Sequence, residues 1–232
     1  MSKKVLISAV LLFYLTSLSA AEPFLYGEFV YNMNFDLKTA PFPGMSAEEF
    51  EARSDEDYED QVYRSLLEEA RWIFSAMIYG LTVIYTPSDL ARDVDRLYDA
   101  RLKAQIPFGD PRLYIYDTFV EDNVFHAFVR YELDPYQKRR VEYWESGVFG
   151  SSASYGFWPY FEEGSRINAI KDGIRVALEN QLKPEIFNKP REIEAEVILR
   201  ECPLITVDAG QNRAFVKIRS NVKNLQAYRV NN

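Results

Sequence analysis

The sequence is poor in the two residues that most often carry metal and nucleophile chemistry. It has one cysteine, Cys202, and one histidine, His126, in 232 residues. An internal disulfide needs two cysteines, and zinc sites usually draw on several histidine and cysteine ligands. Cys202 precedes Pro203 in an apolar stretch, where a buried and unreactive side chain is the common outcome. We therefore expect no disulfide, no metal and no cofactor.

The motifs of common enzyme classes are also missing. The sequence contains neither G-x-G-x-x-G nor the Walker phosphate loop, and residues 150–156 lack the spacing of a serine-hydrolase elbow. A serine triad would need His126, which falls in the middle of a predicted strand. The acidic run 55–60 fails as a calcium loop, because Asp60 stands where the turn glycine should be. We therefore expect no catalytic residue, and the sequence favours a non-enzymatic protein.

Positive charge is in short supply as well. The chain carries a net charge of −8 at pH 7, with 35 acidic against 27 basic residues. A protein this acidic does not condense on a phosphate backbone, so we expect no nucleic-acid partner. With 27% charged and 47% hydrophobic residues, the composition is that of a folded globular protein.

The first twenty residues have the order of a secretory signal. A short basic start precedes the apolar run 5–15 and the small residues 17–21, which a signal peptidase requires. We expect cleavage after Ala20, so that residues 1–20 are a signal peptide and the exported chain is periplasmic or extracellular. An uncleaved N-terminal anchor is the alternative.

No later apolar run is long enough to cross a membrane. The strongest candidate for a membrane span after the first twenty residues is Trp72–Tyr85. It has only 14 residues and is interrupted by Gly80, whereas a spanning helix needs about 20 residues. We expect no membrane span in the mature chain.

Hydrophobic periodicity predicts two long amphipathic helices. From Tyr58 to Tyr79 the apolar positions follow helical spacing, and Gly80 is a natural stop. Five side chains of this helix share one face: Val62, Leu66, Ala70, Ile73 and Met77. A second helix with a clean apolar face is predicted over residues 167–182.

Capping residues predict two further helices. Asp134 is a suitable N-cap and Gln137 stands at the capping-box position, so a short helix should follow to about Trp144. Thr86 and Pro87 suggest another helix start. The buried stripe of that helix would consist of Leu90, Val94 and Leu97.

The remaining pattern predicts an α+β fold, in which amphipathic helices pack on a mainly antiparallel sheet built from hairpins. The predicted strands cover residues 24–37, 81–85, 112–119, 124–133, 193–199, 204–207 and 213–219. Residues 21–232 would form a single domain. The alternative is two lobes, 21–146 and 162–232, joined by an aromatic Gly/Ser loop, 147–161.

That predicted loop holds the candidate contact site. Five aromatic residues lie close together in it: Tyr155, Phe157, Trp158, Tyr160 and Phe161. Rigid aromatic rings on a loop can bind a protein partner, a glycan or an apolar ligand. Alternatively, the loop folds back and plugs the core.

Two weaker candidates consist of charged residues. Lys138, Arg139 and Arg140 form a basic triplet that could contact an anionic partner, although a solvated helix face explains them more simply. Glu162 and Glu163 beside the aromatic loop could act on a glycosidic bond. Charges at the start of the helix near 167 explain this pair better.

Residues 71–80, which run into 85–92, and residues 136–140 resemble uncharacterised secreted proteins of spirochaete-type bacteria. The resemblance covers the middle third of the chain and rests on helix ends and caps. It implies a location in the cell envelope, in the periplasm where such cells also house their flagella. It implies no activity and no catalytic residue.

Three functional hypotheses follow. The first is a non-enzymatic binding or assembly protein of the bacterial envelope, which contacts an envelope or periplasmic protein, such as a flagellar or outer-membrane component, through the aromatic loop. The second is a periplasmic carrier of an apolar or glycan ligand. The third is a carboxylate-based hydrolase of envelope glycans.

Overall fold

The computed structural model describes residues 24–32, 55–162, 164–183 and 191–226. Its helices are α4 (Asp55–Ile78), α5 (Pro135–Ser146) and α6 (Ser165–Leu182). Its strands are β1 (Phe24–Asn32), β2 (Leu81–Thr86), β3 (Leu97–Leu102), β4 (Leu113–Glu121), β5 (Val124–Glu132), β6 (Gly150–Pro159), β7 (Glu192–Leu199), β8 (Leu204–Asp208) and β9 (Gln211–Gln226). The predicted α+β fold with antiparallel sheet is confirmed.

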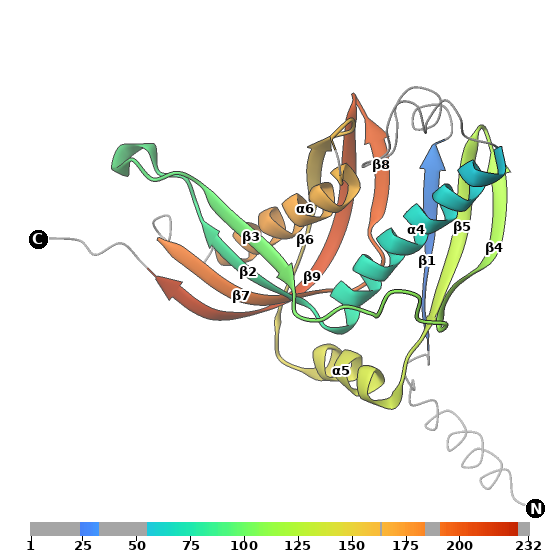
Figure 1. The fold of residues 1–232 in the computed structure, drawn as a ribbon. Coiled ribbons are helices and arrows are strands. Elements are labelled where there is room, and N and C mark those ends of the chain that lie inside the picture. Colours follow the sequence, from blue (N-terminus) through green and yellow to red (C-terminus); the bar gives the residue numbers. More distant parts are fainter. Residues whose placement is uncertain (1–23, 33–54, 163, 184–190, 227–232) are drawn as a thin grey trace, which may run out of the picture.

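The strands form two antiparallel sheets (Figure 1). One has three strands in the order β1-β5-β4, and the other runs β3-β2-β7-β9-β6, with β8 also paired to β9. The long β9 pairs with β6 and β8 through its first part and with β7 through its last. Two hairpins, β4–β5 and β8–β9, join strands that were predicted from the sequence.

Helix α4 lies across the three-stranded sheet and supplies much of the core (Figure 1). All five apolar side chains predicted for its inner face are buried. Phe74 packs edge-on against Phe29 of β1, with ring centroids 5.9 Å apart, and Tyr63 packs in the same way against Phe125 of β5 at 5.4 Å. Burial of this face, rather than helix propensity, accounts for most of the helix's stability.

Helix α6 packs on β6 and β9 of the larger sheet, where its apolar face is buried. The contact with β6 is made through two glycines, Gly156 on the strand and Gly173 on the helix. A Cβ atom on Gly156 would lie only 2.0 Å from the backbone N of Gly173. Strand and helix can therefore approach this closely only because neither position carries a side chain.

The helix predicted to start near Thr86 is wrong. Only a 3-10 turn, Leu90–Arg92, forms there, capped by the Asp89 side chain, which accepts from the backbone N–H of Ala91 at 3.1 Å. Leu90 is 95% exposed, so the expected buried stripe does not exist. The reason is a long-range one: residues 97–102 pair with β2 as strand β3, which leaves too little chain for a helix.

The predicted loop 147–161 is also corrected, because ten of its residues form strand β6. Every residue from Gly150 to Pro159 is paired with β9. The Gly and Ser residues of this segment do not indicate a strand in the local sequence. The strand forms because it pairs with β9, a distant segment of the chain. The larger sheet also joins β2 and β3 to β7, so strands from both sides of this segment share one sheet.

Residues 1–20, the predicted signal peptide, lie outside the described residues. Within the described part of the chain, no helix is both long and apolar enough to cross a membrane.

Candidate functional site

Strand β6 divides the predicted aromatic residues between two faces. Successive side chains of a strand point to opposite sides. Tyr155 and Phe157 point away from α6 and are 43% and 44% exposed. Trp158 points the other way, packs against the core and donates from Nε1 to Glu162 Oε2 at 2.7 Å. The alternative prediction, in which the whole segment packs into the core, therefore holds for Trp158.

The last two predicted residues lie in the turn after β6. Tyr160 is half-buried, and its backbone N–H donates to the carbonyl O of Gly210 at 3.0 Å, which ties this turn to the turn of the β8–β9 hairpin. Phe161 is 86% exposed. The structure therefore brings Tyr155 and Phe157 together on one face and places the other three residues elsewhere.

Residues of β9 complete the face that Tyr155 and Phe157 begin. Phe215 pairs with Tyr155 across the strands, and their ring centroids are 4.9 Å apart. Arg213 pairs with Phe157, and its guanidinium lies 4.0 Å from the centroid of the Tyr155 ring. We call these four residues the outer aromatic surface. Sequence reasoning missed Arg213 and Phe215, although they alternate with buried residues in a strand that it did predict.

Arg213 has unused hydrogen-bonding capacity. Its Nε is buried and has no hydrogen-bond partner, and its side chain forms no ion pair with the described residues. The neighbouring Lys217, by contrast, pairs with Glu201 at 2.9 Å. A guanidinium that lies over an aromatic ring and forms no ion pair is suited to donate hydrogen bonds to a carboxylate of a partner protein.

The outer aromatic surface has a rigid support. Helix α6 backs it at the Gly156–Gly173 contact, and the backbone N–H of Phe157 donates to Asp172 Oδ2 of α6 at 3.1 Å. Asp172 is itself held by Arg175 at 2.8 Å. This contact occupies an edge N–H of β6, which disfavours addition of a further strand there. A partner would therefore meet the side chains of this face rather than the strand edge.

A second exposed aromatic group lies on the three-stranded sheet, on the face opposite α4. Tyr26, Tyr116 and Phe119 are 57%, 53% and 41% exposed, and Phe128 of β5 lies between the rings of β4. Sequence reasoning missed this group. A partial signal was available, because Phe128 lies on the face of β5 opposite the buried Ala127 and Val129, which pack in the core.

The only thiol and the only imidazole of the chain line the same cavity, of about 360 Å³, between β1 and β8. Burial raises the pKa of the Cys202 thiol to about 12, so the reactive thiolate is not formed at neutral pH. His126 Nδ1 lies 2.6 Å from Glu28 Oε1, and its ring stacks on Phe119 at 4.3 Å between centroids. This arrangement offers no activated nucleophile.

Two of the charged candidates, Arg140 and Glu162, also have structural partners. Arg140 caps the end of α4, donating to the carbonyl O of Ile78 at 3.3 Å and of Tyr79 at 3.1 Å. Glu162 accepts from Trp158, and Glu163 lies outside the described residues. No group of three His, Cys, Asp or Glu side chains that could hold a metal ion is found within the described ranges.

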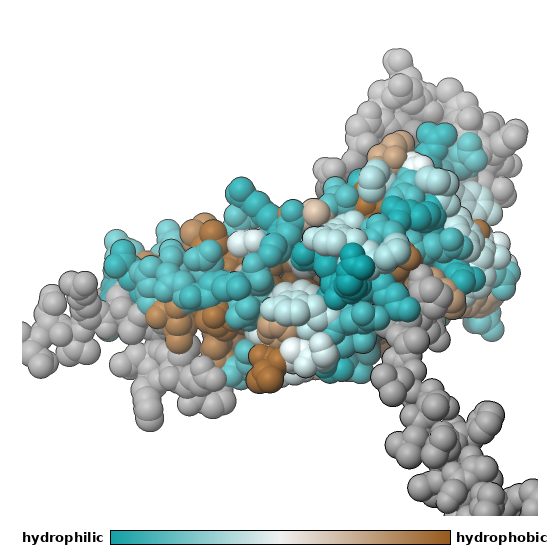
Figure 2. All heavy atoms as spheres, turned by 90° about the horizontal axis from the view of Figure 1, so that it is seen from below, coloured by the Kyte–Doolittle hydropathy of each residue, from teal (hydrophilic) through white to brown (hydrophobic). Residues whose placement is uncertain are grey.

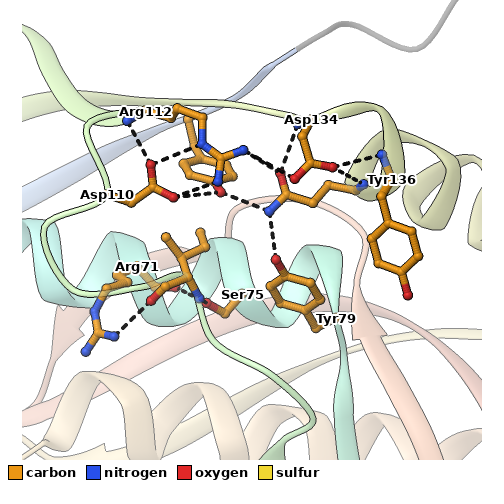
Figure 3. A network of polar contacts seen from close by, with 10 residues as sticks. Arg71, Ser75, Tyr79, Asp110, Arg112, Asp134 and Tyr136 are labelled. Carbon is orange, nitrogen blue, oxygen red and sulfur yellow. Dashed lines mark hydrogen bonds and ion pairs between the residues drawn. The ribbon is translucent and has the colours of Figure 1, made fainter.

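A buried polar network joins α5 to α4 and the three-stranded sheet (Figure 3). At its centre Gln137, 2% exposed, donates from Nε2 to the hydroxyls of Tyr79 at 2.7 Å and Tyr131 at 2.9 Å. The predicted capping box is confirmed: Gln137 Oε1 accepts from the Asp134 backbone N–H, and the Asp134 side chain accepts from the Gln137 N–H. Arg112 bonds to Asp110 at 2.7 Å and to Asp134 at 3.3 Å. These contacts position α5; they do not form an open site.

The network makes stability dependent on pH. Hydrogen bonds from Arg112 hold the pKa of Asp110 below its usual value, and the backbone N–H of Gln137 does the same for the pKa of Asp134. A carboxyl with a depressed folded-state pKa stabilises the fold above its unfolded pKa, and this contribution is lost as the pH falls through the folded value. We expect the free energy of unfolding to drop as the pH falls below about 4.

Urea denaturation followed by circular dichroism at neutral and acidic pH measures this effect. Asp110→Asn should be less stable than the wild type at neutral pH and should lose less stability on acidification. An acid-induced loss of the same size in Asp110→Asn and in the wild type would contradict the assignment.

The comparisons with known proteins agree with the expected bacterial group. No curated protein and no solved structure matches the chain. A protein-family model matches residues 27–228, which include most of β1, every other helix and strand of the described residues, and the outer aromatic surface. The resemblance had pointed to spirochaete-type bacteria, and the family takes its name from a protein of the spirochaete Treponema pallidum. The chain therefore belongs to the family named after that Treponema pallidum protein.

Proposed function

We propose that this protein is a non-enzymatic binding or assembly protein of the bacterial cell envelope, and that it contacts a protein partner through the outer aromatic surface. The observation that carries the proposal is the exposure of Tyr155 and Phe157 on a rigid strand, beside an Arg213 that forms no ion pair with the described residues. Tyrosine and arginine are the residues that most often dominate the energy of a protein interface, with aromatic rings enriched there in general.

The chemistry of the surface describes the partner. The rings of Tyr155, Phe157 and Phe215 offer flat apolar contact, so the partner should present an apolar or aromatic side chain. The guanidinium of Arg213 lies over one of these rings, so the partner should also bring a carboxylate next to its apolar group. A carboxylate shielded by the rings would form a charge-assisted hydrogen bond stronger than one in open water.

The location in the envelope rests on the sequence of residues 1–20, which has the order of a cleaved export signal. Membership of a family named after a spirochaete protein agrees with the bacterial origin that the proposal assumes. The proposed partner is thus an envelope or periplasmic protein, with flagellar and outer-membrane components as the first to examine.

The carrier and hydrolase hypotheses have less support. The cavity between β1 and β8 could hold a small apolar ligand, but it contains the Glu69–Arg166 ion pair as well as the Glu28–His126 pair. For a hydrolase, Glu162 is occupied by Trp158. Neither alternative has an observation as specific as the outer aromatic surface.

A pull-down from envelope extracts tests the proposal. The full chain, tagged at its C-terminus and expressed in its native cells, should recover a stoichiometric partner and should have lost residues 1–20 by mass. Phe157→Ala and Arg213→Gln should each lower recovery of that partner at least about tenfold, since an interface hot spot contributes 2 kcal/mol or more.

Tyr116→Ala is the matched control. Tyr116 is an aromatic residue of similar exposure, 53%, on the other sheet. This variant should recover the partner as the wild type does. Equal recovery with all three variants would remove the outer aromatic surface from the proposal, and the absence of any stoichiometric partner would contradict the proposed function itself.

A further inference from the structure

A hollow of about 280 Å³ lies between α5, the end of β3 and the middle of β7. It is separate from the outer aromatic surface, because it is lined by other elements. The residues used below that line it are Lys103, Tyr136, Arg139, Arg140, Tyr143 and Glu196. Figure 2 views the molecule from below, the side on which α5 lies in Figure 1, and shows a mostly hydrophilic surface there, with hydrophobic side chains in small groups.

Helix α5 presents its lining residues from one face. Tyr136, Arg140 and Tyr143 follow one another at intervals of four and three residues, which places them side by side along a helix. The two tyrosine side chains are 57% and 60% exposed, so their rings are largely uncovered. Arg140 is held between them by the carbonyl oxygens at the end of α4.

Among the cations that line the hollow, Arg139 is the one for which the described residues provide no partner. Its side chain is exposed and forms no hydrogen bond or ion pair with the described residues. A guanidinium presents five N–H donors in a plane that matches a carboxylate or a phosphate. On a chain with a net charge of −8, an arginine that is unpaired among the described residues and lies in a hollow beside two other cations is a local site for an anion.

Glu196 sets a second requirement for the ligand. It accepts from Lys103 Nζ at 2.5 Å and lies 3.4 Å from Lys223 Nζ. The hydrogen bond from Lys103 lowers the pKa of Glu196, so its carboxylate is ionised at neutral pH and can only accept hydrogen bonds. A ligand made of anionic groups alone would gain no hydrogen bond from Glu196, whereas a hydroxyl group could donate to it.

We propose that this hollow binds a small sugar that carries one anionic group, either a phosphate or a carboxylate. Arg139 pairs with the anion, Glu196 accepts from a hydroxyl, and the rings of Tyr136 and Tyr143 contact the apolar face of the sugar. The volume is just below the usual range of small-molecule pockets, about 300–1,000 Å³, which suits a single sugar ring rather than a polymer. The site does not depend on the proposed protein partner.

Isothermal titration of the full chain with four probes tests the proposal: glucose 6-phosphate, glucuronate, glucose and inorganic phosphate. At least one of the two charged sugars should bind at least about tenfold more tightly than glucose and than inorganic phosphate. Glucose lacks the anionic group, and inorganic phosphate lacks the sugar ring with its hydroxyl groups. Binding of glucose 6-phosphate alone would identify the anion as a phosphate, and binding of glucuronate alone would identify it as a carboxylate.

Two charge-removing variants of α5 locate the site. Arg139→Gln should weaken binding of the charged sugar at least about tenfold. Lys138→Gln removes the same charge one residue away, from a side chain that does not line the hollow, and should change binding less than about twofold. Three results would overturn the proposal: no binding of either charged sugar at millimolar concentration, equal loss in the two variants, or phosphate binding as tightly as the sugars.

Discussion

Replacing Gly156 with alanine is expected to destabilise the protein by more than about 3 kcal/mol, a large part of the stability of a typical domain. A Cβ at this position would lie 2.0 Å from the backbone N of Gly173 and 2.2 Å from the carbonyl O of Ala169. Both atoms belong to the α6 backbone, which cannot turn aside as the end of a side chain can. Strand β6 would have to separate from α6, and the core between them would open.

Gly109→Ala is the control for this prediction. Gly109 has a φ of +71°, which disfavours alanine, but a Cβ there would meet nothing within 4 Å. Its cost should be about 1–2 kcal/mol, from the left-handed backbone alone. Urea denaturation followed by circular dichroism compares the two variants with the wild type. If Gly156→Ala cost no more than Gly109→Ala, the close approach of β6 to α6 would be wrong.

Replacing Gln137 with leucine is expected to cost about 2–4 kcal/mol, although the side chains are similar in size and the site is buried. Leucine can neither donate to the hydroxyls of Tyr79 and Tyr131 nor accept from the backbone N–H of Asp134 (Figure 3). Each buried polar group left without a partner costs about 1–3 kcal/mol. The loss should exceed the gain from placing an apolar side chain in the interior.

Glu145→Leu tests whether this effect belongs to the network. Glu145 lies on the same helix, but its side chain is exposed. This variant should change the free energy of unfolding by less than about 0.5 kcal/mol. Thermal or urea denaturation distinguishes the two. A Gln137→Leu protein as stable as Glu145→Leu would show that the three elements are held together without the network.

The parts of the fold that depend on neighbouring residues could be predicted from the sequence. The apolar face of α4 repeats with helical spacing, and the capping box of α5 lies within four residues, Asp134 to Gln137. The β4–β5 hairpin has its turn directly between its strands. In each case the residue pattern that specifies the element lies within it or next to it, so it is visible locally.

Two errors arose where distant segments decided the outcome. Strand β6 is rich in Gly and Ser and shows no regular alternation of apolar and polar residues, yet β9 pairs with all of it. The helix expected near Thr86 had suitable capping residues, but strand β3 forms instead by pairing with β2. Tertiary pairing overrode local preference in both places.

The candidate site shows the same division. The richness of residues 155–161 in aromatic rings, the single cysteine and histidine, the acidic balance and the export-type leader are all properties of the sequence itself. Only the tertiary structure decided which rings lie outside, because the face that a strand residue occupies depends on where its partner strands and helix lie. It also placed Arg213 over Tyr155 and Arg139 in the hollow beside Glu196, since these neighbours come from segments far apart in the chain.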